Sequence, residues 1–152
     1  MVITLYTAEL INDLRTKSHY EASNFIPDVE ARYRAEAGAE KREDLSRCIS
    51  EGFDRLRHRC WRFLKDEYIQ QADNTISLPD QVDIELTLTE RRAVNKALPL
   101  KEAFHTFVIE YALSKFYSDV HVPDLSNKHS LLAIDAGNRI DELLFTKLPP
   151  RV

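Results

Sequence analysis

The sequence predicts a mainly α-helical fold: one bundle of about four to five helices with a short inserted β-hairpin, in a single domain over residues 1–152. Three observations support this prediction. Good helix formers are plentiful, whereas only 3 residues are glycine, too few for a loop-rich or all-β fold. Apolar residues recur at steps of three and four over long segments. A β segment at about residues 75–88 alternates instead with a period of two.

The composition limits the class of protein. Hydrophobic residues make up 43% of the chain and charged residues 30%, which is typical of a soluble globular domain with a core of its own. The net charge of -4 argues against a protein coated in positive charge for nucleic acid, although it permits a local basic patch. Two cysteines are too few for a disulfide framework, so we expect a reducing cytoplasm.

The start of the chain, "MVITLYTAEL", lacks the basic region and long apolar run of a signal peptide. No segment approaches the roughly 18 apolar residues of a membrane-spanning helix. We therefore expect no membrane partner and a location in the cytoplasm of the bacterial host, or in a virion if the resemblance described below holds.

The N-terminal part is predicted to form a short strand followed by helices. Residues 2–6, "VITLY", favour an edge strand or an extended arm. Thr7 is placed to cap a first helix that reaches about Ser23. A break follows at Pro27, and Pro27 with Asp28 opens a second helical piece.

The strongest helical pattern runs from Ala39 to about Glu67. Apolar or small residues recur there at steps of three and four, at Leu45, Ile49, Gly52, Leu56, Cys60 and Phe63. Such a stripe predicts one long amphipathic helix that packs against a core.

The β segment follows this helix. Its apolar side chains alternate with polar ones, at Val82, Ile84, Leu86 and Leu88. This period predicts a half-buried strand with one wet face. Pro79 and Asp80 supply turn chemistry, so the segment can form a hairpin with Ile76 and Leu78. It can also pair with the N-terminal strand or with another chain, and the pattern leaves these three alternatives open.

Two further helices are predicted in the C-terminal part. The helix from about Pro99 to Val120 is apolar nearly all round, which predicts the central and most buried element. The segment "HVPDLSNK" interrupts the chain, and a last helix runs from about Ser126 to Lys147.

Cysteine and histidine are concentrated in "SRCISEGFDRLRHRCWRF", which raises the question of a metal or redox site. On one helix, Cys48 and Cys60 lie about 120° apart in azimuth and about 18 Å apart along the axis. His58 is only two residues from Cys60, so the two side chains diverge. We therefore interpret the cysteines as core residues. A cluster of His121 and His129 with nearby aspartates matches no known metal signature.

No nucleotide-binding, nucleophile-elbow or C-x-x-C motif occurs in the sequence. We accordingly expect no catalytic residues, no cofactor and no metal. An enzyme whose catalytic groups meet only in space is the remaining alternative, and it would need a pocket with several convergent titratable side chains.

A basic strip, "RLRHRCWRFLK", could contact phosphate or another protein. We define it by Arg55, Arg59, Trp61, Arg62 and Lys65. On a continuous helix its three arginines share one face, and the tryptophan could stack on a base or an arginine. Alternatively the strip is a solvated face whose arginines pair with nearby acids, or an oligomer contact.

The order of elements resembles a known class of protein. A short β-prone start and amphipathic helices lead to "SLPD…LTL", then "LPLKEAFHTFVIEYALSKFYSD" and a Pro-Arg tail. This order is similar to small proteins encoded in phage and prophage structural gene clusters, and among named groups to the helical head-tail connector (adaptor) proteins. The resemblance implies a ring subunit between portal and tail, without catalytic groups.

We therefore expect a non-enzymatic structural or assembly protein that contacts copies of itself or neighbouring virion proteins. The β segment and residues 2–6 are the expected contact elements, because an exposed strand can extend the sheet of a neighbour. The alternative is a nucleic-acid-associated adaptor that uses the Arg55–Lys65 strip.

Overall fold

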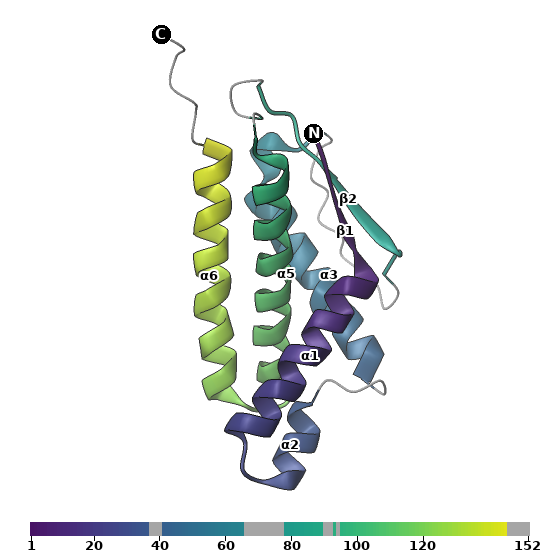
Figure 1. The fold of residues 1–152 in the computed structure, drawn as a ribbon, viewed down its shortest axis with the longest axis vertical. Helices are drawn as coiled ribbons and strands as arrows, with labels where there is room; N and C mark the ends of the chain where they lie inside the picture. The colour runs from purple at the N-terminus through teal and green to yellow at the C-terminus, as the bar shows by residue number, and fades with distance from the viewer. Residues whose placement is uncertain (37–40, 66–77, 90–92, 94, 146–152) are drawn as a thin grey trace.

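The computed structural model describes residues 1–36, 41–65, 78–89, 93 and 95–145. Along the chain its elements are β1 (Val2–Tyr6), α1 (Thr7–Phe25), α2 (Val29–Ala35), α3 (Arg42–Arg59), a 3₁₀ turn (Trp61–Phe63), β2 (Gln81–Glu85), α5 (Ala97–Asp119) and α6 (Pro123–Phe145). Helix α5 packs against α6, α3 and α1, while β1 and β2 form a small sheet to one side (Figure 1). The predicted mainly α-helical bundle with a short β element is confirmed.

Helix α5 is the central helix because its sequence is apolar nearly all round. It begins at Ala97 and ends at Asp119, close to the predicted bounds. Its buried side chains come from every side of the helix: Leu100, Ala103, Phe104, Phe107, Val108, Ile109, Glu110, Ala112, Leu113, Phe116 and Tyr117. A helix with no polar face must be covered by its neighbours. The predicted central position is therefore confirmed.

Helix α6 begins earlier than predicted. It starts at Pro123 rather than near Ser126, because proline is favoured in the first turn of a helix and Asp124 adds an acid there. The turn from α5 into α6 is made by His121, whose φ of 61° lies in the left-handed region. The segment "HVPDLSNK" therefore contains a tight turn and the first turn of α6, and not a longer break.

The predicted N-cap of α1 is wrong. The hydroxyl of Thr7 donates to the carbonyl of Pro79, at 2.5 Å between the oxygens, and makes no cap hydrogen bond. Thr7 is buried as the first residue of the helix, where it ties α1 to the segment before β2. Helix α1 continues to Phe25, slightly beyond the predicted end, and α2 begins at Val29, directly after Asp28.

Helix α3 is shorter than the helix predicted up to Glu67. It ends at Arg59, and a 3₁₀ turn follows. Leu64 then forms a β-bridge with Leu86, which takes the chain away from the helix axis. Packing of Phe63 and pairing of Leu64 outweigh the local helical preference of this stretch. The predicted start at Ala39 lies outside the described residues.

The sheet joins the N-terminal strand to a strand near the middle of the chain. β1 and β2 are antiparallel, with Ile3 opposite Ile84 and Leu5 opposite Val82. Of the three alternatives for the β segment, the described part therefore pairs with the N-terminal strand. Residues 75–77, the other half of a local hairpin, lie outside the described residues.

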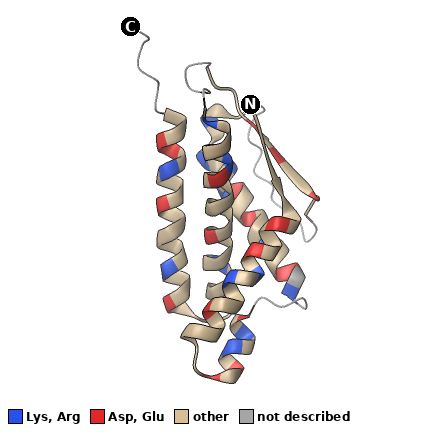
Figure 2. Cartoon of the chain, viewed as in Figure 1, with Lys and Arg blue, Asp and Glu red and all other residues tan. Residues whose placement is uncertain are grey.

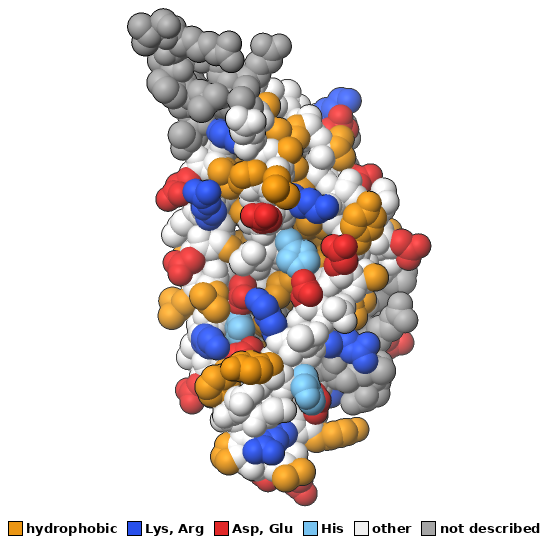
Figure 3. Space-filling model, in the orientation of Figure 1, with side chains coloured by type: hydrophobic (Ala, Val, Ile, Leu, Met, Phe, Trp, Pro, Cys, Tyr) orange, Lys and Arg blue, Asp and Glu red, His pale blue; other side chains and the backbone are white. Residues whose placement is uncertain are grey.

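Charged residues of both signs are interspersed along the helices (Figure 2). On the face shown in Figure 3, acidic, basic and hydrophobic side chains are likewise mixed. Among the described helices, none combines the length and the apolar character that crossing a membrane requires.

Candidate functional site

The backbone ladder of the sheet defines which groups of β1 face β2. Met1 and Leu86 exchange two backbone hydrogen bonds, with N···O distances of 3.0 and 2.7 Å. At the other end, the N–H of Thr7 donates to the carbonyl of Asp80 at 3.0 Å. Hydrogen-bonded pairs alternate along an antiparallel ladder. The backbone N–H and C=O groups of every second residue, starting from Met1 just before β1, therefore face β2.

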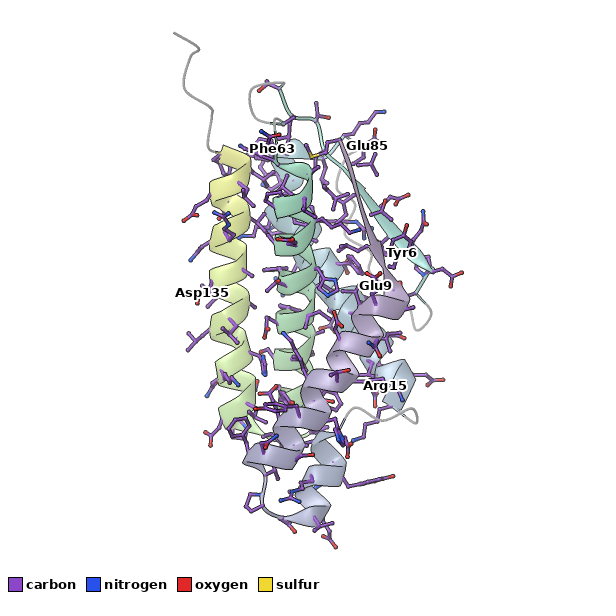
Figure 4. All side chains as sticks on the ribbon, viewed as in Figure 1. Tyr6, Glu9, Arg15, Phe63, Glu85 and Asp135 are labelled. Atoms are coloured by element: carbon purple, nitrogen blue, oxygen red, sulfur yellow. The ribbon has the colours of Figure 1, made fainter. Side chains whose placement is uncertain are left out.

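The intervening residues of β1 form an open edge, which we define by Val2, Thr4 and Tyr6. Their N–H and C=O groups point away from β2, and the described part of the chain contains no third strand beside them. The side chains of Val2 and Tyr6 are 53% and 45% exposed. Figure 4 labels Tyr6 and Glu85, which stand at opposite ends of this sheet.

The predicted strand-pairing residues of β2 pair within the chain. Their side chains face the core, buried at Val82, Ile84 and Leu86 and half-buried at Leu88. The second edge of β2 is partly occupied: Lys65 donates its N–H to the carbonyl of Glu85 at 3.1 Å, and Thr87 donates to Phe63 at 2.6 Å. The open edge of the sheet therefore belongs to β1.

The structure divides the basic strip. Arg59 crosses from α3 to α6, where its Nε donates to the carbonyl of Gly137 at 2.8 Å and its Nη2 lies 2.8 Å from Oδ2 of Asp141. Lys65 pairs with Glu85 at 3.2 Å. Two of the predicted phosphate contacts are thus occupied by ion pairs within the chain.

The remaining residues of the strip lie on two elements. The prediction that one continuous helix carries Arg55, Arg59 and Arg62 is wrong, because α3 ends at Arg59 and Arg62 lies in the 3₁₀ turn that follows. The guanidinium of Arg62 lies over the ring of Trp61, 5.5 Å from its centroid, and Trp61 is 56% exposed. Arg55 is exposed on α3, at the rim of a groove.

The two cysteines are core residues, as predicted. Cys48 and Cys60 are 2% and 0% exposed. Burial is the main cause that raises the pKa of each thiol to about 12, so both stay protonated at neutral pH. Within the described residues, no three His, Cys, Asp or Glu side chains are arranged to hold a metal ion.

A buried charged cluster, which we define by Glu21, Glu110 and His129, joins three helices. The three side chains come from α1, α5 and α6 and are each at most 4% exposed. The Nε2 of His129 lies 2.6 Å from Oε1 of Glu21, and its Nδ1 bonds to Oε2 of Glu110. Both ring nitrogens face carboxylates, which is the arrangement that a doubly protonated imidazolium satisfies.

Three further groups complete the cluster. Lys128 approaches Oε2 of Glu21 at 3.1 Å, and Lys17 approaches Oε1 of Glu110 at 2.9 Å. The hydroxyl of Tyr117 donates to Glu21 at 3.4 Å. Each buried carboxylate therefore has one buried and one partly exposed cationic partner.

The electrostatics of the cluster favour its charged form. Burial alone would raise the carboxyl pKa values, but the hydrogen bonds and charges of His129, Lys128 and Lys17 outweigh it, and the pKa values of Glu21 and Glu110 lie below 4.5. Burial alone would lower the pKa of His129, but both glutamates outweigh it and raise this pKa above 6.5. These groups are closed to solvent and satisfied by one another, so we assign them a structural role.

This cluster is not predicted from the sequence, where His129 is grouped with His121. The structure separates the two histidines: His121 is exposed in the turn before α6, and His129 is buried. The available signal was an acid at a core position: Glu110 directly follows Val108 and Ile109 in the apolar α5, and Glu21 lies on the buried side of α1. A buried acid usually has a cationic partner, but sequence does not indicate which one.

Residues of α3, α5 and α6 line a surface groove. Its volume is about 350 Å³, and it is lined by Arg55, His58, Arg59, Phe107, Tyr111, Ser114, Ser130, Ala133 and Ile134. Among the described residues that line it, three are basic and none is acidic. The groove lies within the size range of ligand-binding clefts, but its described lining does not include the paired acid and base that would indicate catalysis.

Comparisons with protein-family models, with curated proteins and with solved structures found no match to this chain.

Proposed function

We propose that the protein is a non-enzymatic assembly subunit, of the phage or prophage virion type that resembles head-tail connectors, and that it acts through protein-protein contacts. The observation that carries this proposal is the open edge of β1, where the backbone groups of Val2, Thr4 and Tyr6 face outward. A neighbouring strand that adds there would satisfy these groups.

The composition of β1 supports its role as a contact. Strands at the edges of sheets usually carry lysine, proline or a bulge that discourages pairing with other chains. The sequence "VITLY" contains neither charge nor proline, and its outward side chains Val2 and Tyr6 are largely exposed. Nothing within the strand opposes the addition of another strand.

The helical body suits a subunit of a closed ring. The strand is anchored at both ends, through Met1 and Thr7, to a core built around α5. A head-to-tail contact forms when a different segment of the neighbouring copy adds to the open edge of β1, and such contacts close into rings when the rotation per subunit permits. Protein partners suit this chain better than nucleic acid, because Arg59 and Lys65 of the basic strip are paired with acids.

The test replaces Thr4 by proline. The N–H of Thr4 faces the open edge, so Thr4→Pro removes a donor for a neighbour and leaves the backbone hydrogen bonds between β1 and β2 in place. We expect the wild-type chain to form a defined oligomer in light scattering, and Thr4→Pro to shift it to the monomer at equal concentration.

Thr4→Val is the matched control. It removes the hydroxyl bond from Thr4 to Asp83, as proline does, but keeps the N–H, so its oligomer should equal the wild type. A wild-type chain that is monomeric at high concentration would overturn the proposal, and so would equal oligomers for Thr4→Pro and Thr4→Val. The virion class is tested separately by gene context: neighbouring portal, capsid and tail genes support it, and their absence contradicts it.

A further inference from the structure

The open edge of β1 is complementary to a second copy of itself. Its outward residues are Val2, Thr4 and Tyr6, and Thr4 stands at their centre. When a second β1 lies antiparallel beside the first with the two Thr4 residues opposite each other, Val2 of each copy faces Tyr6 of the other. Each of these three pairs can exchange two backbone hydrogen bonds, which gives about six bonds around a two-fold axis.

No other antiparallel register pairs all of these groups. A shift by one residue places the outward groups opposite those of Ile3 and Leu5, whose N–H and C=O groups face β2. A shift by two residues leaves one outward residue of each strand without a partner. The central position of Thr4 in the edge therefore selects a single register.

The side chains also match in this register. Val2 and Tyr6 are 53% and 45% exposed on the outer face of the sheet, and each would pack on the other across the contact. The remaining pair is Thr4 with Thr4 of the second copy. Pairs of an aromatic with a β-branched residue, and pairs of threonines, are among the cross-strand pairs that stabilise antiparallel sheets.

The charges near the edge do not oppose the pairing. β1 itself carries no charged side chain. Asp83 and Glu85, the acids on the outer face of the sheet, belong to β2. In a four-stranded sheet of order β2-β1-β1-β2, the two β2 strands lie three strand spacings apart, about 14 Å, which exceeds the Debye length of about 8 Å at physiological ionic strength.

The small size of the contact predicts a reversible dimer. Protein interfaces carry about one hydrogen bond per 100–200 Å², so about six bonds correspond to roughly 600–1,200 Å² of buried surface. This area lies at the lower limit of specific interfaces. A contact of this size can form between free copies and later be exchanged for another.

We propose that two free copies of the chain pair antiparallel through β1, centred on Thr4, and that this dimer keeps the edge closed until a neighbour in the assembly replaces the second copy. The inference rests on the proposed function, because it names what occupies the same edge before assembly. The dimer and the assembly exclude each other, since both use the outward backbone groups of Val2, Thr4 and Tyr6.

The test uses cysteine variants of the full-length chain under mild oxidation by oxidised glutathione. Cys48 and Cys60 are 2% and 0% exposed, so we expect neither to react. Opposite residues of a hydrogen-bonded antiparallel pair have Cα atoms about 5.5 Å apart, a distance that a disulfide spans. Thr4→Cys should therefore form a covalent dimer at least about tenfold faster than Ser23→Cys, an exposed control on α1, because pairing raises the effective concentration of the thiols.

A second set of variants tests the register. A mixture of Val2→Cys and Tyr6→Cys should form the mixed covalent dimer as rapidly as Thr4→Cys dimerises. Each of the two variants alone should react no faster than Ser23→Cys. In the selected register the same residue of the two copies is offset by four positions along the strands, about 13 Å, which is too far for a disulfide.

Two outcomes would overturn the inference: equal rates for Thr4→Cys and Ser23→Cys, or a rate for Val2→Cys alone that equals the rate of the mixture. Both differ from failure of the proposed function. If Thr4→Pro yields monomers but Thr4→Cys reacts no faster than Ser23→Cys, another segment uses the edge and only the self-pairing fails. If the expected cross-links form but portal, capsid and tail genes are absent nearby, the self-pairing stands and the virion class fails.

Discussion

The Nε2 atom of His129 lies 2.6 Å from Oε1 of Glu21, so a bond inside the core joins α6 to α1 across 108 residues of sequence. The other ring nitrogen of His129 bonds to Glu110 on α5. One imidazole thus holds three helices together. The stability of a buried network of this kind depends strongly on the protonation of each member.

The stabilisation that the cluster provides should decrease both in stronger acid and at higher pH. The pKa values of Glu21 and Glu110 are lowered below 4.5, so their contribution is complete above that pH and is lost as these carboxylates bind protons in stronger acid. The pKa of His129 is raised above 6.5, so its contribution is complete below that pH and is lost as the pH rises through the folded value.

The contribution of the cluster should therefore be greatest between pH 4.5 and 6.5. Urea unfolding at a series of pH values measures it as the difference in free energy of unfolding between the wild type and His129→Leu. A difference that stays constant across the series would contradict the assigned protonation states.

Removing the buried cation His129 should lower the free energy of unfolding more than removing Lys128, a half-exposed cation that contacts the same carboxylate. His129→Leu leaves Glu21 and Glu110 without their buried partner, so we expect a loss of about 3 kcal/mol or more in the free energy of unfolding. Lys128 contacts the same Glu21 but is 50% exposed, so Lys128→Met should cost less than about 1 kcal/mol. Chemical denaturation near pH 6 compares the two, and equal costs would refute the structural role of His129.

Gly137 makes room for the side chain of Arg59. A Cβ at Gly137 would lie 2.5 Å from Cζ of Arg59, so Gly137→Ala must displace the guanidinium from Asp141. We expect a loss of about 1 kcal/mol in the wild-type background. In the Arg59→Ala background, the same substitution should stabilise by about 0.5–1 kcal/mol, because alanine is the better helix former. A double-mutant cycle measures both effects, and the same sign in both backgrounds would count against this packing.

The cysteines should be unreactive in the folded protein. Cys48 and Cys60 are buried, and their pKa values are raised to about 12. A thiol reagent should label neither of them in native buffer and both of them in urea, because the thiolate is the reactive form. Ser23→Cys, at an exposed position of α1, is the positive control and should react at once. Rapid labelling of the native wild type would show that the packing around α3 is looser than described.

The nucleic-acid alternative predicts salt-sensitive binding through the basic strip. Because Arg59 and Lys65 pair with Asp141 and Glu85, we expect no measurable binding of duplex DNA at low salt in a fluorescence anisotropy titration. Binding that decreases with salt, and again with Arg55→Ala and Arg62→Ala, would restore that alternative.

Local patterns in the sequence determined the main elements of this fold. The apolar residues on nearly all sides of α5 and the period of two in β2 are properties of short segments. Both elements lie close to the residues predicted for them. The same holds for the burial of Cys48 and Cys60, whose positions on the apolar stripe follow from helical spacing alone. Periodicity is informative here because the apolar face of each element must meet a core.

Only the tertiary structure decided what these elements contact. Two of these features are contacts between segments that lie far apart in the chain: the pairing of β1 with β2 and the contact of Glu21 with His129. The end of α3 at Arg59 depends on such contacts. The physical reason is that a helix or strand face can be read from its own residues, whereas its partner depends on the free energy of packing the whole core. A glutamate at a core position predicts a cationic partner, and only the folded chain shows that this partner is His129.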